Sequence, residues 1–182
     1  RKKEDDPFAV GAVDAPVVIS EFSDFECPFC SRHANVTEPD LLKKYVEKGL
    51  VRIEWNDFPV NGPAAVDAAK AGRAAAAQGK FQEFKHELYT ASKDINGHPE
   101  FGIEDFMKFA EKAGVADLDK FRQQATDDTY TEVIEKATSY ASQIGITGTP
   151  AFVVGDQFIG GAQPPEVFEQ TIREQLGKAA NG

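Results

Sequence analysis

Apolar residues follow two kinds of pattern along this chain, one typical of strands and one typical of helices. Residues 17–22 are almost continuously apolar and residues 51–55 alternate, and both runs are typical of β-strands. A helical pattern spans residues 30–47 between them, with an interruption expected near Pro39. Residues 10–13 are a shorter candidate strand at the start. A strand, a helix and a strand in this order predict a right-handed parallel βαβ unit.

The middle of the chain, residues 63–144, has helical patterns throughout. An Ala-rich stretch at residues 64–78 is followed by amphipathic stripes, which predict a block of helices with an apolar core. Strand character returns at residues 151–154 and 157–159, separated by a Gly-Asp turn that predicts an antiparallel pair. An amphipathic helix follows Pro165. The predicted order is therefore βαβ, a helical block, and ββα.

Composition limits the kinds of partner. The 182 residues are 41% hydrophobic and include 14 Phe, which is enough to build a core for one elaborated domain or two small ones. The net charge of -10 argues against nucleic acid or an anionic membrane surface as a partner. No apolar stretch is long enough to span a bilayer. The hydrophilic start (RKKEDD) suggests a tether behind a removed signal peptide or membrane anchor.

The chemistry is expected at Cys27 and Cys30, which are the only cysteines. They lie at a strand-to-helix junction, where unpaired backbone N–H groups and the helix dipole favour a thiolate. Cys27 is expected to be the exposed attacking sulfur, and Cys30 lies on nearly the same helical face, where it can resolve a mixed disulfide. Pro28 suits the first helical position. This spacing predicts a redox pair.

Other interpretations of the cysteines carry less weight. Cys27, Cys30 and His33 form a Cys-x-x-Cys-x-x-His run, but a closed zinc site needs a fourth ligand and none is nearby in the sequence. A purely structural disulfide would close a tiny loop and remove little entropy from the unfolded chain. We therefore expect no metal and no cofactor. His33 is expected to be an exposed helix residue, and His86 and His98 to be surface residues.

Four short segments are specific enough to point to a family. They are residues 21–30 (EFSDFECPFC), 57–59 (DFP), 78–81 (QGKF) and 145–152 (GITGTPAF). Together they resemble the DsbA-like extracytoplasmic thiol–disulfide oxidoreductases of bacteria, and the resemblance covers nearly the whole chain after the first ten residues. It implies an α/β chain with a thioredoxin fold (βαβ…ββα) and a large inserted all-helical domain.

The resemblance also divides the chain. It implies a tether at residues 1–9, a thioredoxin-like domain made of residues 10–62 and 145–182, and an inserted helical domain at residues 63–144. Exported proteins would be the substrates, and the chain would work outside the cytoplasm, secreted or membrane-anchored. A monomer reoxidised by a membrane quinone-linked partner, DsbB- or VKOR-like, is expected.

Two further site elements follow from the resemblance. Thr149–Pro150 is expected to be a cis peptide facing the sulfurs, where the Thr149 backbone can pair with an extended substrate. The alternative is an ordinary trans proline that begins a strand. Glu21 matches a buried acid whose raised pKa would let it exchange a proton with Cys30. The alternative is a carboxylate at a strand edge that pairs with a lysine.

The residues around the cysteines leave the direction of the reaction open. The best-known DsbA proteins have Pro-His between the cysteines, whereas this chain has Phe29, which cannot stabilise a thiolate in the same way. Asp24 and Glu26 are expected to disfavour the Cys27 thiolate further. Phe25 and Phe29, with the Thr149–Pro150 turn, are expected to form an apolar rim for unfolded chains.

The expected activity is therefore the introduction of disulfides into exported proteins by exchange through Cys27 and Cys30. A reductase or isomerase on the same fold is one alternative, although isomerases of this group usually carry a dimerisation domain. A peptide-binding, holdase-like module with incidental cysteines is another. Glutathione-linked transfer is a third, which the intact Cys-x-x-Cys disfavours.

Overall fold

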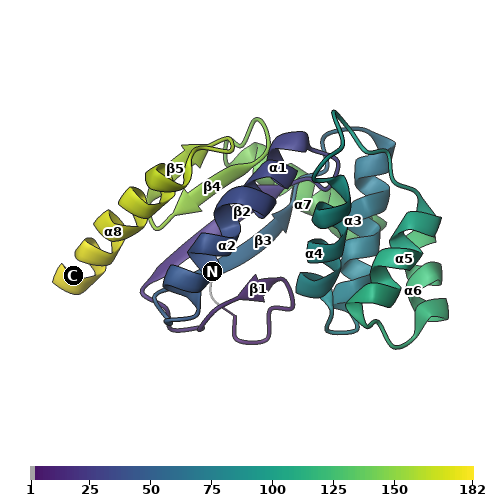
Figure 1. Ribbon diagram of the computed structural model, residues 1–182, viewed down its shortest axis with the longest axis horizontal. Helices are drawn as coiled ribbons and strands as arrows, with labels where there is room; N and C mark the ends of the chain where they lie inside the picture. The colour runs from purple at the N-terminus through teal and green to yellow at the C-terminus, as the bar shows by residue number, and fades with distance from the viewer. Residues whose placement is uncertain (1–2) are drawn as a thin grey trace.

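The computed structural model describes residues 3–182. Within this range, five strands form one sheet in the order β1-β3-β2-β4-β5 (Figure 1). The strands are β1 (Ala9–Val10), β2 (Val17–Ser23), β3 (Val51–Asp57), β4 (Ala151–Val154) and β5 (Gln157–Gly160). β2 and β3 are parallel, as predicted, and every other pair in the sheet is antiparallel. β1 is shorter than the predicted strand because Gly11 adopts a φ of 108°, which takes the chain out of the strand.

The helix between β2 and β3 continues past Pro39, contrary to the predicted interruption. It consists of α1 (Pro28–Arg32), the π-helical segment η1 (His33–Thr37), α2 (Glu38–Leu41) and the π-helical segment η2 (Leu42–Val46). Thr37, at the start of α2, keeps right-handed helical angles (φ -97°, ψ -46°). Pro39 lies in the first turn of α2, where a missing N–H is tolerated. The wider π-helical turns on either side accommodate the proline without breaking the helix.

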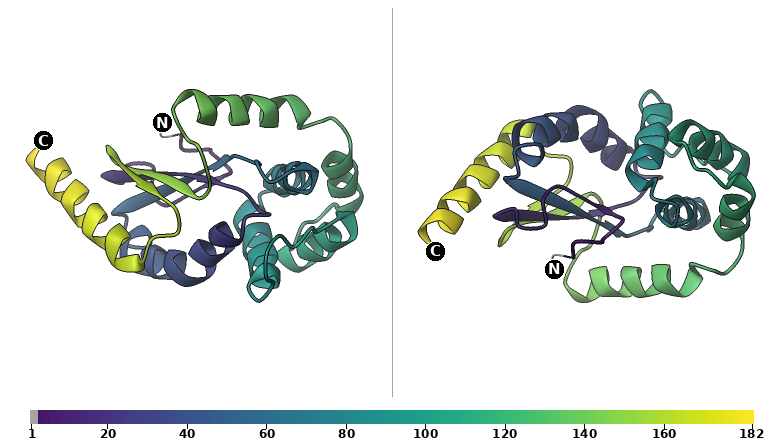
Figure 2. Two further views of the ribbon diagram at one scale, coloured as in Figure 1. Left: turned by 90° about the horizontal axis from the view of Figure 1, so that it is seen from above. Right: turned by 90° about the horizontal axis from the view of Figure 1, so that it is seen from below.

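The predicted helical stripes are all helices in the structure. They are α3 (Pro63–Ala76), α4 (Phe81–Ser92), α5 (Ile103–Ala113), α6 (Leu118–Thr126) and α7 (Thr131–Gln143). α3 to α6 pack together at one end of the sheet, whereas α7 returns along one sheet face (Figure 2). The opposite face is covered by α1 to η2 and by the last helix, α8 (Pro165–Asn181) (Figure 2). The element order is thus βαβ, helices, and ββα.

A cluster of aromatic side chains joins the sheet to the helices. Phe25 stacks on Trp55 with ring centroids 4.8 Å apart, and Phe84 and Tyr89 from α4 pack around it. α3 approaches closely at Gly72, where an added Cβ would lie 2.9 Å from the Phe25 ring. Phe25 is only 2% exposed, so it belongs to this core and not to an apolar rim, and that prediction was wrong.

The first described residues lie against the helical part. The Phe8 ring packs on Phe81 at 4.9 Å, and the guanidinium of Arg73 lies over Phe8. Residues 1 and 2 of the expected tether lie outside the described residues. Among residues 3–182, no helix has the length and apolar character needed to cross a membrane.

Candidate active site

The two cysteines lie at the start of α1 as free thiols. Cys27 is the N-cap residue and Pro28 begins the helix, as expected. The Cys30 backbone N–H donates to the Cys27 sulfur at 3.3 Å, and the Cys27 thiol lies 3.5 Å from the Thr149 carbonyl oxygen. Cys27 is 5% exposed, less than predicted, because the Thr149 backbone lies against its sulfur. The Thr149–Pro150 peptide bond is cis.

The two sulfurs have opposite acidities. The pKa of Cys27 is lowered from 9.0 to about 6, chiefly by a hydrogen bond with the Cys30 side chain and also by the N–H groups of Phe29 and Cys30, while burial opposes the shift. Burial raises the pKa of the Cys30 thiol well above its usual value. Cys27 is therefore the thiolate at neutral pH and Cys30 the neutral thiol. These acidities agree with the predicted preference for a thiolate at Cys27, while the attacking and resolving roles of the two sulfurs stay predictions.

The acids beside Cys27, which were expected to disfavour its thiolate, do not prevent the pKa of Cys27 from being lowered. The Asp24 carboxylate accepts hydrogen bonds from the backbone N–H groups of Glu26, Val60 and Asn61 at 2.8–3.0 Å. The Asn61 side chain adds a further bond at 2.7 Å. These donors compensate the negative charge of Asp24, and the pKa of Cys27 is lowered in spite of it.

Glu26 is held by the loop between α4 and α5. Its carboxylate accepts from the backbone N–H groups of Glu100 at 2.8 Å and Phe101 at 3.3 Å. The His98 ring nitrogen Nδ1 bonds the Glu26 carbonyl at 2.8 Å, and His98 is exposed, as predicted. Glu100 adopts a φ of 53°, which is uncommon for a residue with a side chain. The helical part therefore fixes the residue that precedes Cys27.

Glu21 lies in the interior of the sheet, paired with Trp55 of β3 on one side and Phe152 of β4 on the other. It is 2% exposed, so it is a buried acid and not a carboxylate at a strand edge. Burial raises the pKa of Glu21 from 4.5 to about 8, although the nearby Lys85 ammonium opposes the shift. At neutral pH Glu21 therefore carries a proton.

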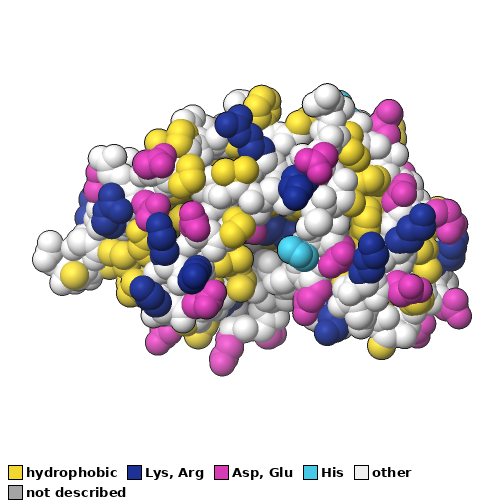
Figure 3. Space-filling view, in the orientation of Figure 1, with side chains coloured by type: hydrophobic (Ala, Val, Ile, Leu, Met, Phe, Trp, Pro, Cys, Tyr) yellow, Lys and Arg dark blue, Asp and Glu magenta, His cyan; other side chains and the backbone are white. Residues whose placement is uncertain are grey.

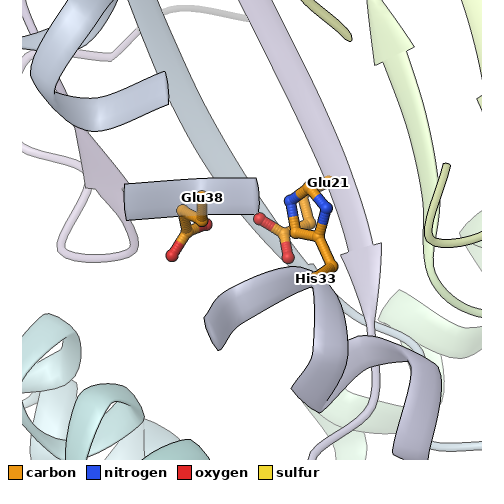
Figure 4. A group of neighbouring side chains, drawn as sticks. All are labelled: Glu21, His33 and Glu38. Atoms are coloured by element: carbon orange, nitrogen blue, oxygen red, sulfur yellow. The ribbon is translucent and has the colours of Figure 1, made fainter. Parts of the chain in front are cut away.

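Two further buried groups meet Glu21, as Figure 4 shows. Glu38 approaches from α2, and His33 approaches from η1. His33 is 2% exposed, contrary to the expected surface position, because its ring packs on Phe152 at 4.4 Å and Phe168 at 5.0 Å. Burial lowers its pKa from 6.5 to about 4, so the imidazole is neutral.

The ligand atoms of Glu21, His33 and Glu38 lie within 4.8 Å of one another, which raises the question of a metal ion. Within residues 3–182, one atom of each of these side chains is buried without a hydrogen-bond partner: Glu21 Oε1, His33 Nδ1 and Glu38 Oε2. The buried Lys85 ammonium, however, lies 2.7 Å from Glu38 Oε1 and already supplies the positive charge. A proton on Glu21, donated to Glu38, would satisfy both carboxylates without adding a second cation. The cluster therefore fits a bound proton better than a divalent metal.

This cluster is close to solvent on one side. A groove of about 390 Å³ between α2 and α4 is lined by Glu38, Lys85 and Tyr89, and the face drawn in Figure 3 is hollowed there. Acidic and basic side chains are interspersed around it (Figure 3). The groove therefore reaches the Glu38 and Lys85 side of the buried cluster.

The match to known proteins decides the family. A thioredoxin family model matches residues 3–174. The chain belongs to the thioredoxin family. Within that family it is DsbA-like, as its motifs predicted. The oxidised form of BdbD from Bacillus subtilis superposes with a TM-score of 0.87 at 21% identity, covering 96% of this chain and 94% of BdbD. DsbA from Chlamydia trachomatis gives 0.79 at 23% identity, covering 92% and 90%. The predicted α/β thioredoxin fold with inserted helices is thereby confirmed.

Relatives of this thioredoxin-family chain are of two kinds. A probable disulfide bond formation protein D from Bacillus cereus is 30% identical over 150 residues, which cover 80% of this chain and 68% of that protein. The Na(+)/H(+) antiporter NhaA 3 from Salinispora tropica is 35% identical over 171 residues, which cover 93% of this chain. The chain spans only 24% of the length of that antiporter.

The thioredoxin-family motifs pointed to the sulfurs, Glu21 and Pro150 but missed the groups that the helices contribute. Lys85 was missed although it lies on the apolar face of α4, between Phe84 and Leu88, where a charged residue is unexpected. Tyr89, one position further along α4 than Leu88, was not predicted as a site residue either. Among the expected rim residues, Phe29 is 59% exposed beside the sulfurs.

Proposed function

We propose that the protein is a thiol–disulfide oxidoreductase that introduces disulfides into exported proteins through Cys27 and Cys30. The observation that carries the proposal is the pairing of a reactive sulfur with a buried one: the Cys27 pKa is lowered to about 6, while the Cys30 pKa is raised. A sulfur that is stable as a thiolate favours the reduced pair, and a protein whose reduced form is favoured oxidises its substrates. The family and the similarity to a probable disulfide bond formation protein support the same activity.

The reaction begins with the disulfide form of the pair. A substrate thiolate attacks the Cys27 sulfur, the Cys27–Cys30 bond breaks, and its electron pair goes to Cys30. A second thiolate of the same substrate then attacks the substrate sulfur that is bonded to Cys27, and Cys27 leaves as a thiolate. Two substrate thiols are oxidised and one enzyme disulfide is reduced. The low pKa of Cys27 makes it a good leaving group in this second step.

We propose roles for the neighbouring residues. Pro28 begins α1, so that the free backbone N–H groups of the first turn of the helix face Cys27. The exposed Phe29 offers apolar surface to an unfolded chain. The Thr149 backbone, beside the Cys27 sulfur and before Pro150, pairs with an extended substrate segment. Glu21, protonated at neutral pH, exchanges its proton with Cys30 as the disulfide opens and closes.

The location and partners follow from the same activity. Disulfides form and persist outside the cytoplasm, whereas cytoplasmic thiols are kept reduced, so we place the chain outside the cytoplasm, secreted or attached to the membrane. The antiporters that contain a similar segment suggest that such a module can also be part of a membrane protein. A membrane quinone-linked protein, DsbB- or VKOR-like, would return the reduced pair to the disulfide, and the chain would act as a monomer.

The reduction potential of the Cys27–Cys30 pair tests the direction of the reaction. Equilibration with glutathione buffers should give a potential more oxidising than that of glutathione, and the protein should oxidise a reduced, unfolded test protein. A potential near that of a cytosolic reductant would instead indicate a reductase. A variant with both Cys27→Ala and Cys30→Ala should lose the activity, and full retention would indicate a binding module.

A further inference from the structure

Two buried hydroxyl groups lie in a row with the sulfur of Cys30. Ser23, at the end of β2, has its side chain near the Cys30 sulfur, and as a hydrogen-bond partner it acts to lower the pKa of that thiol against the effect of burial. Its Oγ lies 3.1 Å from the Oη of Tyr89, which belongs to α4. Tyr89 Oη in turn donates to the backbone carbonyl of Asp24 at 3.3 Å. Ser23 and Tyr89 are 1% and 2% exposed, so the row is shielded from bulk water.

Each hydroxyl carries one hydrogen, so the row can be connected in two directions. When Cys30 is a thiol, its S–H donates to Ser23, Ser23 donates to Tyr89, and Tyr89 donates to the Asp24 carbonyl. When Cys30 is a thiolate, it can only accept. Ser23 then donates to the sulfur, Tyr89 donates to Ser23, and the Asp24 carbonyl gives up its bond. Every hydrogen has an acceptor in both directions.

We propose that Ser23 and Tyr89 form a hydroxyl switch that stabilises the Cys30 thiolate at the moment the Cys27–Cys30 disulfide opens. Ser23 contacts the reacting sulfur and is a catalytic residue in this sense. Tyr89 is a positioning residue that acts through Ser23. The inference rests on the proposed function for its biological meaning, and it adds a role for the helical insertion, which supplies Tyr89.

The step is balanced without any proton entering or leaving. The attacking thiolate forms a bond to Cys27, the bond to Cys30 breaks, and Cys30 takes the electron pair. The hydroxyl hydrogens of Ser23 and Tyr89 rotate toward the sulfur, so that the Ser23–Tyr89 bond reverses and the Tyr89 bond to the Asp24 carbonyl is given up. This matters because Cys30 is 1% exposed, so water cannot solvate the new charge. The Glu21 proton takes no part in this step, and its proposed exchange with Cys30 is a separate step.

The ring-closing reaction tests the switch, because its rate depends on the Cys30 thiolate. Cys27 is first joined to glutathione, and the first-order release of glutathione by Cys30 is followed against pH. In Ser23→Ala, the apparent pKa of Cys30 should rise by about one unit, a tenfold loss of thiolate at pH 7. A more basic thiolate is about threefold more nucleophilic, so the net rate should fall about threefold. Tyr89→Phe should give a smaller rise.

A double-mutant cycle separates the switch from a packing role. Tyr89→Phe should shift the pKa of Cys30 in the wild-type background and produce no further shift in the Ser23→Ala background. Tyr45→Phe is the matched control, since it removes a hydroxyl that donates to Glu169 of α8. It should leave the pKa of Cys30 unchanged. The switch is wrong if Ser23→Ala leaves the pKa of Cys30 unchanged, or if Tyr89→Phe shifts it equally in both backgrounds.

The effect of Ser23 and Tyr89 on the pKa of Cys30 can be measured whether or not the proposed function is correct. Closing of the glutathione adduct needs no protein substrate, so a wild-type protein that fails to oxidise substrates would contradict the proposed function and leave the cycle intact. If Ser23→Ala does not fold, Tyr89→Phe, which keeps the ring packing, still decides the matter: an unchanged pH profile in that variant would overturn the switch.

Discussion

Replacing Glu21 by Gln should stabilise the protein at neutral pH. The Glu21 carboxyl is buried in the central strand of the sheet, and its pKa is raised from 4.5 to about 8. The unfolded chain can ionise this carboxyl near pH 4.5 and gains free energy by doing so, whereas the folded protein cannot. A glutamine side chain removes this difference, because it is neutral in both states and can donate to Glu38 as the protonated acid does.

The magnitude follows from the two pKa values. Below pH 4.5 both states hold the proton and Glu21 has no effect on the free energy of unfolding. As the pH rises from 4.5 to 8, the unfolded state loses its proton first, so the stability of the folded protein falls by about 1.4 kcal/mol for each pH unit. The loss reaches about 3 kcal/mol at pH 7 and about 5 kcal/mol above pH 8. Glu21→Gln should regain up to these amounts.

Urea unfolding of the reduced protein at pH 4.5, 7 and 9 measures the effect. The difference in the free energy of unfolding between Glu21→Gln and the wild type should grow with pH, and contributions from other groups cancel in it. Glu132→Gln is the control, since Glu132 is an exposed residue paired with Lys136, and its difference from the wild type should not vary with pH. If the free energies of unfolding of the wild type and Glu21→Gln differ by the same amount at all three pH values, Glu21 is not a neutral acid in the folded protein.

Three further predictions concern the same site. His33→Phe should make the protein less sensitive to acid. The buried imidazole has a pKa of about 4, against 6.5 in the unfolded chain, so the free energy of unfolding of the wild type falls by about 3 kcal/mol between pH 6.5 and pH 4. Equal acid-unfolding midpoints for the two proteins would contradict this. Lys85→Met leaves the Glu38 carboxylate buried without its ammonium and should cost about 3–5 kcal/mol in urea unfolding, so an unchanged midpoint would count against the ion pair. Cys30→Ala removes the hydrogen bond that is the main cause of the low Cys27 pKa. In a titration of thiolate absorbance, the pKa of Cys27 should rise by about one unit. A value still near 6 would assign the shift to the N–H groups of the helix backbone.

Local patterns predicted most of the fold, because each strand and helix has a hydrophobic rhythm of its own. The nearly continuous apolar run of β2 and the alternation of β3 follow from their places in the sheet. The Cys-x-x-Cys at the end of β2 predicted the reactive centre, because a lone pair of cysteines at a strand-to-helix junction favours redox chemistry over a zinc site, which needs four ligands. Glu21 stood out for a similar reason, as an acid within an apolar strand.

The errors at the site concern residues whose partners lie far away in the sequence. Asp24 was taken as a charge acting on Cys27, but its donors at Val60 and Asn61 are 36 and 37 residues away. Phe25 was placed on the surface because its partners, on β3, α3 and α4, could not be read from its own surroundings. His33 was placed on the surface because a neutral imidazole packs as an aromatic ring, and nothing in the polar sequence around it signals this.

The split of the sheet between two distant segments has a consequence for synthesis. Cys27 and Cys30 emerge from the ribosome early, but β4 and the Thr149 carbonyl, which lies against the Cys27 sulfur, follow the helical insertion. The sheet has order β1-β3-β2-β4-β5, so the central strand β2 remains an open edge until β4 is made. Contacts of such high sequence separation form late. The nascent chain therefore exposes two reactive thiols without the backbone that selects an extended substrate, and its specificity is the last property to be acquired.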